Sequence, residues 1–222
     1  MFNSDFKLIN EAFDTQLVTP ADMDFLLAEG WRNFGTYFFR HNVGIFRGEY
    51  RHVMPLRIRL ADFTLSKSQR RNLERNKDLE IVVRPILIDA EKERLFHRHK
   101  TRFEEYPPDS IYVFLSREPA TIPSEAFEIC CYENDKLLAV SFFNAGNESV
   151  SGIYAMFEPT EVKRGLGIFT MLLEIKYAQV TGKDFYYQGY AYQGESFYDY
   201  KKRFSALEMY DWEGLGWVDF RE

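Results

Sequence analysis

Cysteine is scarce in this sequence of 222 residues, and the two cysteines present, Cys130 and Cys131, are adjacent. Such a pair provides neither a disulfide framework nor a set of metal ligands, so both of these protein classes are excluded. Because the surrounding residues are apolar, we expect the two thiols to be small core residues of a strand. No metal site and no cofactor is predicted.

The sequence also lacks a long apolar run and an excess of positive charge. No segment approaches the ~20 apolar residues that a membrane-spanning helix needs, and no signal peptide opens the chain. Asp and Glu number 34 against 28 Lys and Arg, which gives a net charge of −6 at pH 7. This balance argues against binding duplex nucleic acid over a broad face, but it does not exclude a local basic patch. We expect a cytoplasmic protein without a membrane partner.

Aromatic residues, in contrast, are abundant. They make up 17% of the chain, and hydrophobic residues make up 45%. These values indicate a globular protein with a thick core, or with ring surfaces that stack on a ligand. The length suits one sizeable domain with a small annex. We predict an N-terminal α/β annex over residues 1–60 and a larger domain over residues 61–222.

One stretch organises the rest of the chain. Residues 152–157 are apolar, β-branched or aromatic, and predict a buried strand that Pro159 ends. A basic loop with Gly165 and Gly167 follows, and apolar residues then recur at helical spacing. A second aromatic strand is predicted over residues 185–190. This order predicts two parallel strands joined by a helix.

The two glycines stand where the predicted helix begins. Backbone N–H groups are free at a helix start, and the helix dipole adds partial positive charge there. Gly165 and Gly167 therefore suit a phosphate or a developing oxyanion. The alternative is a tight turn that needs two small residues, because short glycine patterns are weak signals.

Capping patterns mark three further helix starts, at Thr19, Ser66 and Asp89. The second and third of these helices are locally basic, and for the second this indicates either a phosphate-binding patch or an ordinary solvated face. His97 and His99 lie two residues apart and do not face one another, so we expect surface histidines rather than a metal site. The basic residues are Arg70, Arg71, Arg75 and Lys77 in the second helix, and Arg94, Arg98, Lys100 and Arg102 in the third.

The remaining patterned segments predict strands. Residues 54–60 alternate apolar with basic side chains, which places Arg57 on the polar side of a half-exposed strand. Turn residues separate three hairpin-connected strands that lead into the crossover unit. Further strands are predicted over residues 2–13, 31–39, 79–87, 127–132, 137–144 and 149–157.

This succession of elements resembles the GNAT-like acyltransferase fold, an α+β fold of three layers. In that fold two parallel strands splay apart and the acyl donor sits between them. The family's loop pattern is Gln/Arg-x-x-Gly-x-Gly/Ala, and residues 162–167 match it at both glycines. Val162 replaces the polar first position, which argues against acyl-CoA as the donor.

A series of short motifs follows in order along the chain: Pro55-Leu-Arg-Ile58, Ser66-Lys-Ser-Gln-Arg-Arg71, Tyr106-Pro-Pro108, Tyr154-x-x-Phe-Glu-Pro159, Gly165-Leu-Gly167, Tyr187-Gln-Gly-Tyr190 and Tyr200-Lys-x-Arg-Phe204. Each motif alone is weak, but their shared order and spacing carry a resemblance. Over roughly residues 22–204 the chain resembles the aminoacyl-tRNA–protein transferases. These are the arginyl-tRNA–protein transferases and their bacterial relatives that move leucine onto proteins beginning with Asp or Glu.

The sequence departs from this family at its cysteines. The family usually has an N-terminal cysteine motif and a cysteine cluster before the Pro-Leu-Arg segment, which relatives are thought to use for a metal or iron–sulfur centre. Here the second region, residues 42–52, contains no cysteine. Glu195 and Tyr198 stand where the family has a cysteine and a methionine. The resemblance therefore implies no metal site in this chain.

The resemblance implies that an acceptor protein's N-terminal amine attacks the ester of a charged tRNA. The donor is already activated, so no covalent enzyme nucleophile is required, and the enzyme aligns the reactants and stabilises the oxyanion. An α-amine has a pKa of roughly 7.7–8.0, so a modest base suffices to free it. Glu158 is the expected base, with a surface residue in a turn as the alternative. Backbone N–H groups from Gly165 to Gly167 would face the oxyanion or the terminal phosphate.

The remaining residues implied by the resemblance bind the two substrates. Lys201 and Arg203 would bind tRNA phosphates or, alternatively, the acidic first side chain of the acceptor. Aromatic rings would stack on the terminal adenine, although they would equally serve as core aromatics. The expected tRNA-binding residues are Arg57, Arg70, Arg71, Lys163, Arg164, Lys201 and Arg203, and the expected substrate-binding residues are Tyr154, Tyr187, Tyr190 and Tyr200.

The predicted activity is transfer of leucine or arginine from charged tRNA to proteins that begin with Asp or Glu. The spacing of the motifs tilts the prediction toward leucine. Two alternatives stay open on the sequence alone. One is a CoA-dependent N-acyltransferase of the GNAT type, and the other is a non-catalytic relative that kept the fold.

Overall fold

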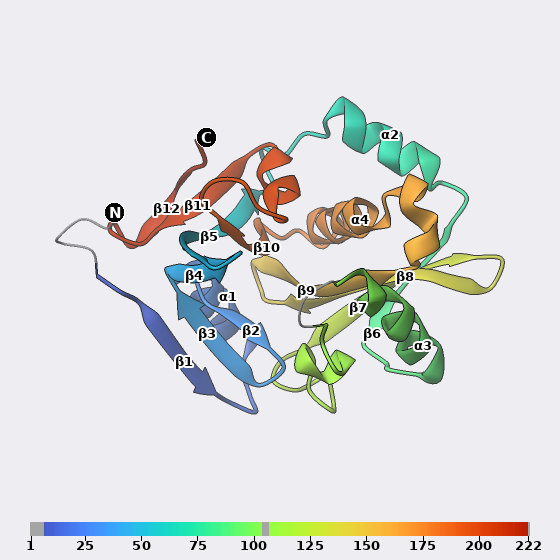
Figure 1. Cartoon of the computed structure of the whole chain (residues 1–222), viewed down its shortest axis with the longest axis horizontal. Helices are drawn as coiled ribbons and strands as arrows, with labels where there is room; N and C mark the ends of the chain where they lie inside the picture. The colour runs from blue at the N-terminus through green and yellow to red at the C-terminus, as the bar shows by residue number, and fades with distance from the viewer. Residues whose placement is uncertain (1–6, 104–106, 222) are drawn as a thin grey trace.

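The computed structural model describes residues 7–103 and 107–221, and within them the core is a nine-stranded sheet (Figure 1). Its strands are β4 (Val43–Phe46), β5 (Glu49–Arg59), β6 (Glu80–Pro85), β7 (Ala126–Glu133), β8 (Lys136–Ala145), β9 (Ser149–Phe157), β10 (Phe185–Tyr192), β11 (Leu207–Asp211) and β12 (Gly216–Asp219). They follow the order β12-β11-β5-β10-β9-β8-β7-β6, and β4 pairs with β5 outside this path.

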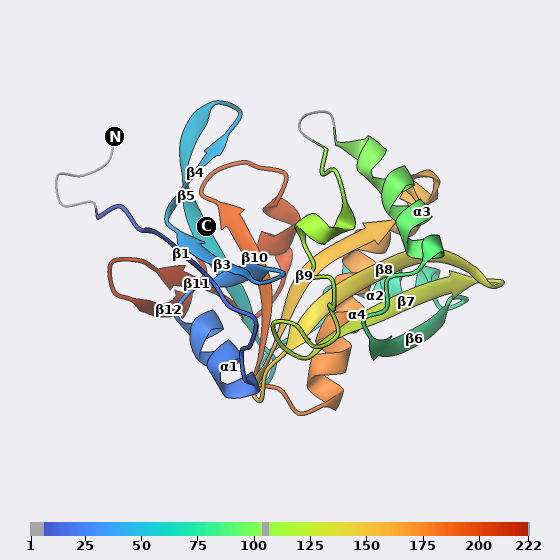
Figure 2. The same ribbon diagram turned by 90° about the horizontal axis from the view of Figure 1, so that it is seen from below.

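Helix α4 (Leu166–Val180) joins β9 to β10, and these two strands are parallel, which confirms the predicted crossover unit. They pair only where residues 185–187 oppose residues 149–151, and beyond this point they part (Figure 2). Each strand shifts its register against its other neighbour where the parting begins. The shift lies at Ile153 between β9 and β8, and at Gln188 between β10 and β5. Gly189 follows with a φ of 88°, a conformation that side chains with a Cβ rarely adopt.

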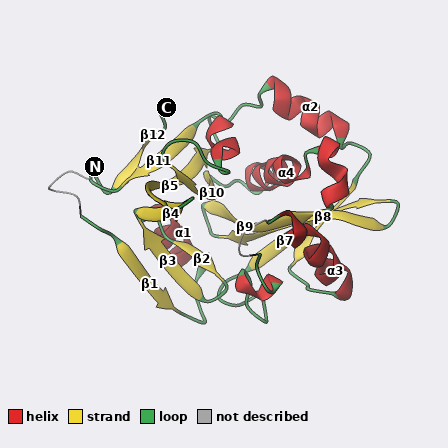
Figure 3. Cartoon of the chain, viewed as in Figure 1, coloured by secondary structure: helices red, strands yellow, loops and turns green. Residues whose placement is uncertain are grey.

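Helices cover both faces of the large sheet. α4 and α2 (Lys67–Arg75) lie over one face, and α3 (Ala90–His99) lies over the other (Figures 1 and 3). Ser66 and Gln69 form the predicted capping box at the start of α2, and Asp89 accepts from the Lys92 N–H at the start of α3. The apolar residues of α4 pack with β5 and β8–β10 in one core cluster. The prediction of a GNAT-like α+β fold is confirmed.

A smaller sheet lies at the N-terminal side. It contains β1 (Asn10–Asp14), β2 (Arg32–Phe34) and β3 (Tyr37–His41) in the order β1-β3-β2, and α1 (Pro20–Ala28) lies between β1 and β2 in the chain. The Asp24 carboxylate of α1 accepts from the N–H groups of Asn147 and Glu148 and from the Ser149 hydroxyl. These bonds fix the small sheet's helix to the start of β9. The predicted domain boundary after residue 60 stays a prediction, and β5, which precedes it, is a strand of the large sheet.

Several local features differ from the sequence prediction. The single strand predicted over residues 31–39 is a hairpin, because Gly35 turns the chain with a φ of 53°. No strand was expected after Phe204, yet residues 207–219 form the β11–β12 hairpin. His99 is buried rather than exposed, whereas His97 is at the surface as expected. The predicted Tyr-Pro-Pro motif begins at Tyr106, which lies outside the described residues.

The buried thiols confirm one expectation from composition. Cys130 and Cys131 are both free and buried in β7. Within the described ranges, no helix is both long and apolar enough to cross a membrane.

Candidate active site

Arg32 lies where β9 and β10 part. It projects from β2, and its guanidinium donates to the Ser151 Oγ at 3.0 Å and to the Gly152 carbonyl at 2.7 Å. A Cβ on Gly189 would lie only 3.0 Å from the Arg32 Cζ, so the glycine makes room for the guanidinium. Burial lowers the pKa of Arg32, yet part of the side chain stays accessible to solvent. These contacts place a cation against both parted strands.

Lys201 brings a second cation to the same place. It comes from the 3-10 turn Asp199–Arg203, and its Nζ donates to the Tyr190 carbonyl at 2.9 Å. Gln188 holds the backbone of this turn by donating to the Lys201 carbonyl at 3.0 Å. Burial, and to a smaller degree repulsion from Arg32, lowers the pKa of Lys201 to about 7. A bound anion would therefore favour the protonated amine.

Neither cation has a carboxylate within 4 Å among residues 7–103 and 107–221. Enclosed charges in proteins are almost always paired, because an unpaired charge loses its hydration without compensation. Arg32 keeps N–H groups beyond the two that bind Ser151 and Gly152, and Lys201 keeps two of its three donors. The arrangement is therefore suited to a ligand that carries a carboxylate.

Glu174 of α4 lies next to Gly152, the residue of β9 whose carbonyl binds Arg32. Its Oε2 accepts from the Tyr186 hydroxyl at 2.6 Å, and a Cβ on Gly152 would lie 2.8 Å from that oxygen. Burial raises the pKa of Glu174 to about 7, even though Tyr186, Ser141 and Arg32 all favour its ionised form. The carboxyl group can thus exchange a proton near neutral pH without leaving the core.

Two buried polar atoms flank the parted strands without a partner in the described part of the chain. They are the hydroxyl of Tyr154 in β9 and the Oε1 of Gln188 in β10. Buried polar groups are rarely left unpaired, so orphaned atoms on both sides of one gap indicate a place that a ligand or water completes. Tyr154 is held in position by Phe114, whose ring stacks on it at 3.9 Å between centroids.

Glu158, the predicted base, lies at the C-terminal end of β9. Its side chain is directed toward α3, where Oε2 accepts from the Arg98 Nε at 2.8 Å and Oε1 has a long contact of 3.4 Å with Thr160. His99 fixes the same strand end, because its Nδ1 lies 3.0 Å from the Phe157 N. Glu158 thus lies at the C-terminal end of β9, whereas Arg32, Lys201 and Glu174 gather where β9 and β10 begin to part. The assignment of Glu158 as the base stays a prediction.

The glycine loop begins α4 as predicted. Gly165 adopts a φ of 62° and serves as the N-cap residue, and a Cβ on Gly167 would lie 3.1 Å from the Phe157 ring. Helix α2 holds this loop, because the Asn72 Nδ2 donates to the carbonyls of Arg164 and Gly165 at 3.1 Å each. The loop is therefore a rigid helix start next to the end of β9. Its proposed contact with an oxyanion or phosphate is untested.

The predicted tRNA-binding residues fall into two groups. Arg57 and Arg164 are engaged within the protein. The Arg57 guanidinium donates to Glu208 at 2.7 Å and stacks on Phe185 and Trp217. Arg164 forms ion pairs with Asp78, Glu133 and Glu161. The others, apart from the enclosed Lys201, are exposed; these are Arg70, Arg71, Lys163 and Arg203.

The exposed cations lie around α2. Ser205 donates to the Thr64 carbonyl and accepts from the Thr64 N–H, which places the Arg203 turn beside the start of this helix. Arg75 donates to the Lys163 carbonyl, which ties the helix to the glycine loop. These contacts place the four exposed cations on neighbouring elements, and we call Arg70, Arg71, Lys163 and Arg203 the basic surface around α2.

The aromatic residues predicted to bind substrate differ in their exposure. Tyr187 is buried and accepts from the Arg57 guanidinium at 3.2 Å, and Tyr190 donates to the Gly30 carbonyl at 2.8 Å. Tyr200 is 39% exposed, and its neutral hydroxyl lies within the electrostatic influence of Glu174 and Arg32. Tyr200 is thus the one of these three whose ring is open to a ligand. Their proposed stacking on adenine stays untested.

Sequence reasoning missed Arg32 and Glu174. Arg32 comes from the small sheet, far along the chain from the crossover unit, and no pattern ties it to β9. Glu174 lies among apolar residues at helical spacing, and its buried position inside α4 was the available signal. A carboxylate on the apolar face of a predicted helix indicates a buried polar partner.

The donor set of this chain does not fit the metal or iron–sulfur centre that relatives with the family's cysteines are thought to hold. Residues 42–52 form β4, its turn and the start of β5, and they contain no cysteine. Cys130 and Cys131 are buried neighbours in β7. In the described residues, no group of three or more His, Cys, Asp or Glu could hold a metal ion.

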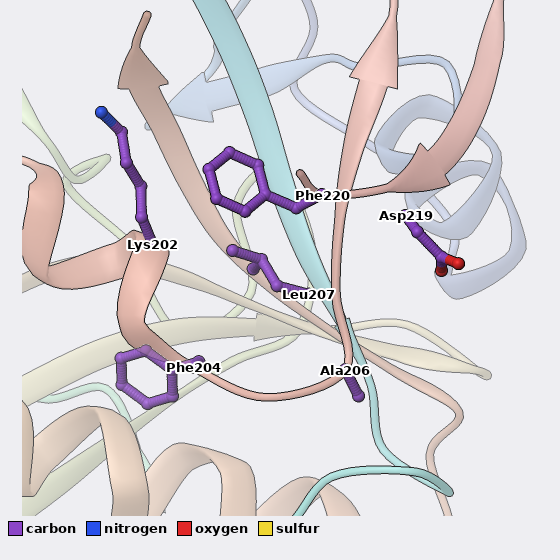
Figure 4. Close-up of a pocket in the computed structure, with 6 residues that line it drawn as sticks. All are labelled: Lys202, Phe204, Ala206, Leu207, Asp219 and Phe220. Carbon is purple, nitrogen blue, oxygen red and sulfur yellow. The ribbon is translucent and has the colours of Figure 1, made fainter. Parts of the chain in front are cut away.

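A pocket near β11 and β12, at one end of the large sheet, brings no reactive groups together. Figure 4 shows it between the Asp199–Arg203 turn and the β11–β12 hairpin, with Lys202 and Asp219 at opposite sides. Its other lining residues are apolar, namely Phe204, Ala206, Leu207 and Phe220. The candidate site is therefore the parting of β9 and β10.

A comparison with solved structures agrees with this architecture. The crystal structure of FemX aligns with a TM-score of 0.50 over 88% of this chain and 68% of that chain. The two sequences are 11% identical, so the likeness concerns the fold alone.

Sequence comparisons identify the family. The family model described as arginine-tRNA-protein transferase, C terminus, matches residues 91–211, which is more than half of the chain. An aspartate/glutamate leucyltransferase of Xanthomonas euvesicatoria pv. vesicatoria (strain 85-10) is 34% identical over 187 residues, covering 74% of this chain and 70% of that protein. Another, of Stenotrophomonas maltophilia (strain K279a), is 29% identical over 202 residues, covering 87% and 78%. The chain therefore belongs to the aminoacyl-tRNA–protein transferase family.

Proposed function

We propose that this chain transfers an amino acid from charged tRNA to the N-terminal amine of proteins that begin with Asp or Glu. The observation that carries the proposal is the pair of enclosed cations, Arg32 and Lys201, which lacks a carboxylate partner in the described residues. An acceptor's acidic first side chain would supply that partner, and charge-assisted hydrogen bonds to it would be strong. Of the two roles predicted for Lys201, binding of tRNA phosphates or of the acceptor's acidic side chain, this proposal takes the second.

The acceptor's first residue would in this way be anchored between the parted strands. With the carboxylate on Arg32 and Lys201, the α-amine lies within a few bonds of the anchor and is directed along the gap. The amine nitrogen forms a bond to the ester carbonyl carbon, and the bond from that carbon to the ribose oxygen breaks. The leaving ribose hydroxyl takes a proton, and the amine gives one up. Most of the catalysis is alignment of two bound substrates.

Proton removal and oxyanion stabilisation complete the mechanism. The predicted base is Glu158, whose Oε1 has, among the described residues, only the long contact with Thr160. The predicted donors to the oxyanion or terminal phosphate are the backbone N–H groups from Gly165 to Gly167. The Gly165 N–H donates to the Val162 carbonyl, so those of Leu166 and Gly167 are the two that we propose for this role. If the Glu158→Gln enzyme turns over at the wild-type rate, Glu158 is not the base.

Label transfer tests the proposed function. The protein is incubated with tRNA charged with labelled leucine or arginine and with peptides that begin with Asp, Glu or Ala. We expect label on the Asp and Glu peptides and little on the Ala peptide, and the productive tRNA identifies the transferred amino acid. Transfer from an acyl-CoA panel, with none from either tRNA, would instead support a CoA-dependent enzyme.

The exposed arginines of α2 are expected to bind tRNA phosphates. Replacing Arg70 and Arg71 together by alanine should weaken tRNA binding and lower the slope of log affinity against log salt by about 1 per lost contact. Turnover at saturating tRNA should change little, because Arg70 and Arg71 are exposed and lie on α2, outside the cluster of Arg32, Lys201 and Glu174. Arg57→Ala is not a suitable control because its guanidinium is partly buried, so the matched control is Arg94→Ala on α3. If the Arg70/Arg71 variant keeps the wild-type tRNA affinity and its salt dependence, these arginines do not bind tRNA.

A further inference from the structure

The hairpin of β4 and β5 carries exposed aromatic and cationic side chains that the transfer mechanism does not use. Arg47 lies at its turn, with its guanidinium 5.4 Å from the Phe46 ring centroid and 5.3 Å from that of Phe197. Phe46 is buried and holds Phe197 at 4.8 Å between centroids, whereas Phe197 itself is 66% exposed. Tyr50 on the same hairpin is also exposed.

This surface continues to the candidate active site. Tyr198 follows Phe197 in the chain and packs against Tyr192 at 5.8 Å. The Lys201 Nζ lies 4.9 Å from the Tyr198 ring centroid and donates to the Tyr190 carbonyl at the parted strands. A row of rings thus leads from the hairpin turn to the Lys201 ammonium. We call Arg47, Phe197 and Tyr198 the aromatic rim.

The chemistry of the rim suits unpaired nucleotides. Bases outside a duplex stack on exposed aromatic rings, and arginine planes and cations add to this attraction. A single exposed phenylalanine is ordinary, but Phe197 stands beside both Arg47 and Tyr198, and such a cluster of exposed rings and a cation is typical of a binding surface. The nearby carboxylates Glu49 and Asp199 are neutralised by Arg51 and Lys202.

We propose that the aromatic rim binds the unpaired 3′ end of the donor tRNA and guides its aminoacyl ester to the parted strands. This inference rests on the proposed function and assigns the path of one of its substrates. The basic surface around α2 would bind the paired stem, while the rim would take the single-stranded end. A peptide bound on the rim is the competing occupant, and the experiment distinguishes the two.

Binding of two RNA hairpins tests the rim. One has a short unpaired 3′ extension and the other ends bluntly, and fluorescence anisotropy measures their affinity for the full chain. We expect Phe197→Ala to weaken binding of the extended RNA by about tenfold, since stacking contributes on the order of 1–3 kcal/mol per base. Binding of the blunt RNA should not change. Phe197→Trp should keep the affinity, because it restores a ring.

Phe25→Ala is the matched control. Phe25 lies on α1 and is 65% exposed, so it removes an equally exposed phenylalanine away from the hairpin. It should leave both affinities unchanged, and Tyr198→Ala should behave like Phe197→Ala. If Phe197→Ala binds both RNAs as the wild type does, or raises only the KM for the acceptor peptide, the inference is wrong while the proposed function stands. If the wild type binds no tRNA at all, the proposed function itself fails.

Discussion

Replacing Arg32 by methionine is expected to lower kcat/KM for a peptide that begins with Asp by about 100- to 4000-fold. The guanidinium is enclosed at the parting of β9 and β10, and in the described chain its charge has no internal carboxylate within 4 Å. Removing one partner of a buried charge pair costs about 3–5 kcal/mol, because the other charge is left without compensation. Each 1.4 kcal/mol corresponds to roughly tenfold in rate. Steady-state transfer kinetics measure the effect.

The control separates recognition from folding. Arg32 also binds Ser151 and Gly152, so thermal unfolding of the variant has to be measured beside its activity. Lys201→Met keeps these contacts and should show a smaller loss in the same direction, whereas tRNA affinity should be unchanged in both variants. If both variants turn over Asp peptides as the wild type does, neither cation binds the acceptor.

Glu174→Gln is expected to remove part of the pH dependence of the free energy of unfolding. The pKa of Glu174 is raised by burial from 4.5 to about 7 in the folded chain. The folded state therefore holds this proton more tightly than the unfolded state. Its contribution is most favourable below pH 4.5 and is lost as the pH rises through 7. Over this window the loss amounts to roughly 3 kcal/mol, at about 1.4 kcal/mol per pKa unit.

Denaturant unfolding between pH 5 and pH 8 measures this loss. Glutamine is neutral throughout and keeps a carbonyl oxygen for the Tyr186 hydroxyl, which now donates to Glu174. The variant should therefore be more stable than the wild type at pH 8 and similar to it at pH 5. Parallel curves for the two proteins over the whole range would show that Glu174 does not titrate there.

The crossover unit and its flanking helices were predictable from sequence because their signals are local. Ser66 and Asp89 cap helices through bonds to residues three positions away, and the apolar periodicity of α4 needs no distant partner. The aromatic strands on either side of the glycine loop are likewise recognisable from composition alone. The order of these local signals determined the predicted parallel pair.

The composition of the site was less predictable because tertiary contacts decide it. Arg57 looked like a free cation on a half-exposed strand, but β11 brings Glu208 to it from the unpredicted C-terminal hairpin. His99 looked exposed in a basic helix, but it faces the end of β9. Arg32 reaches the parted strands from a hairpin that the sequence reading took for one strand. Partners more than 50 residues away leave no local pattern.

The most direct test of the account is the ratio of kcat/KM for two peptides that differ only in beginning with Asp or with Asn. The two side chains have nearly the same shape, so the ratio isolates the charge that Arg32 and Lys201 are proposed to bind. The account predicts that the wild type prefers Asp by at least about 100-fold. Equal transfer to both peptides would contradict it, because two unpaired enclosed cations would then have no part in choosing the acceptor.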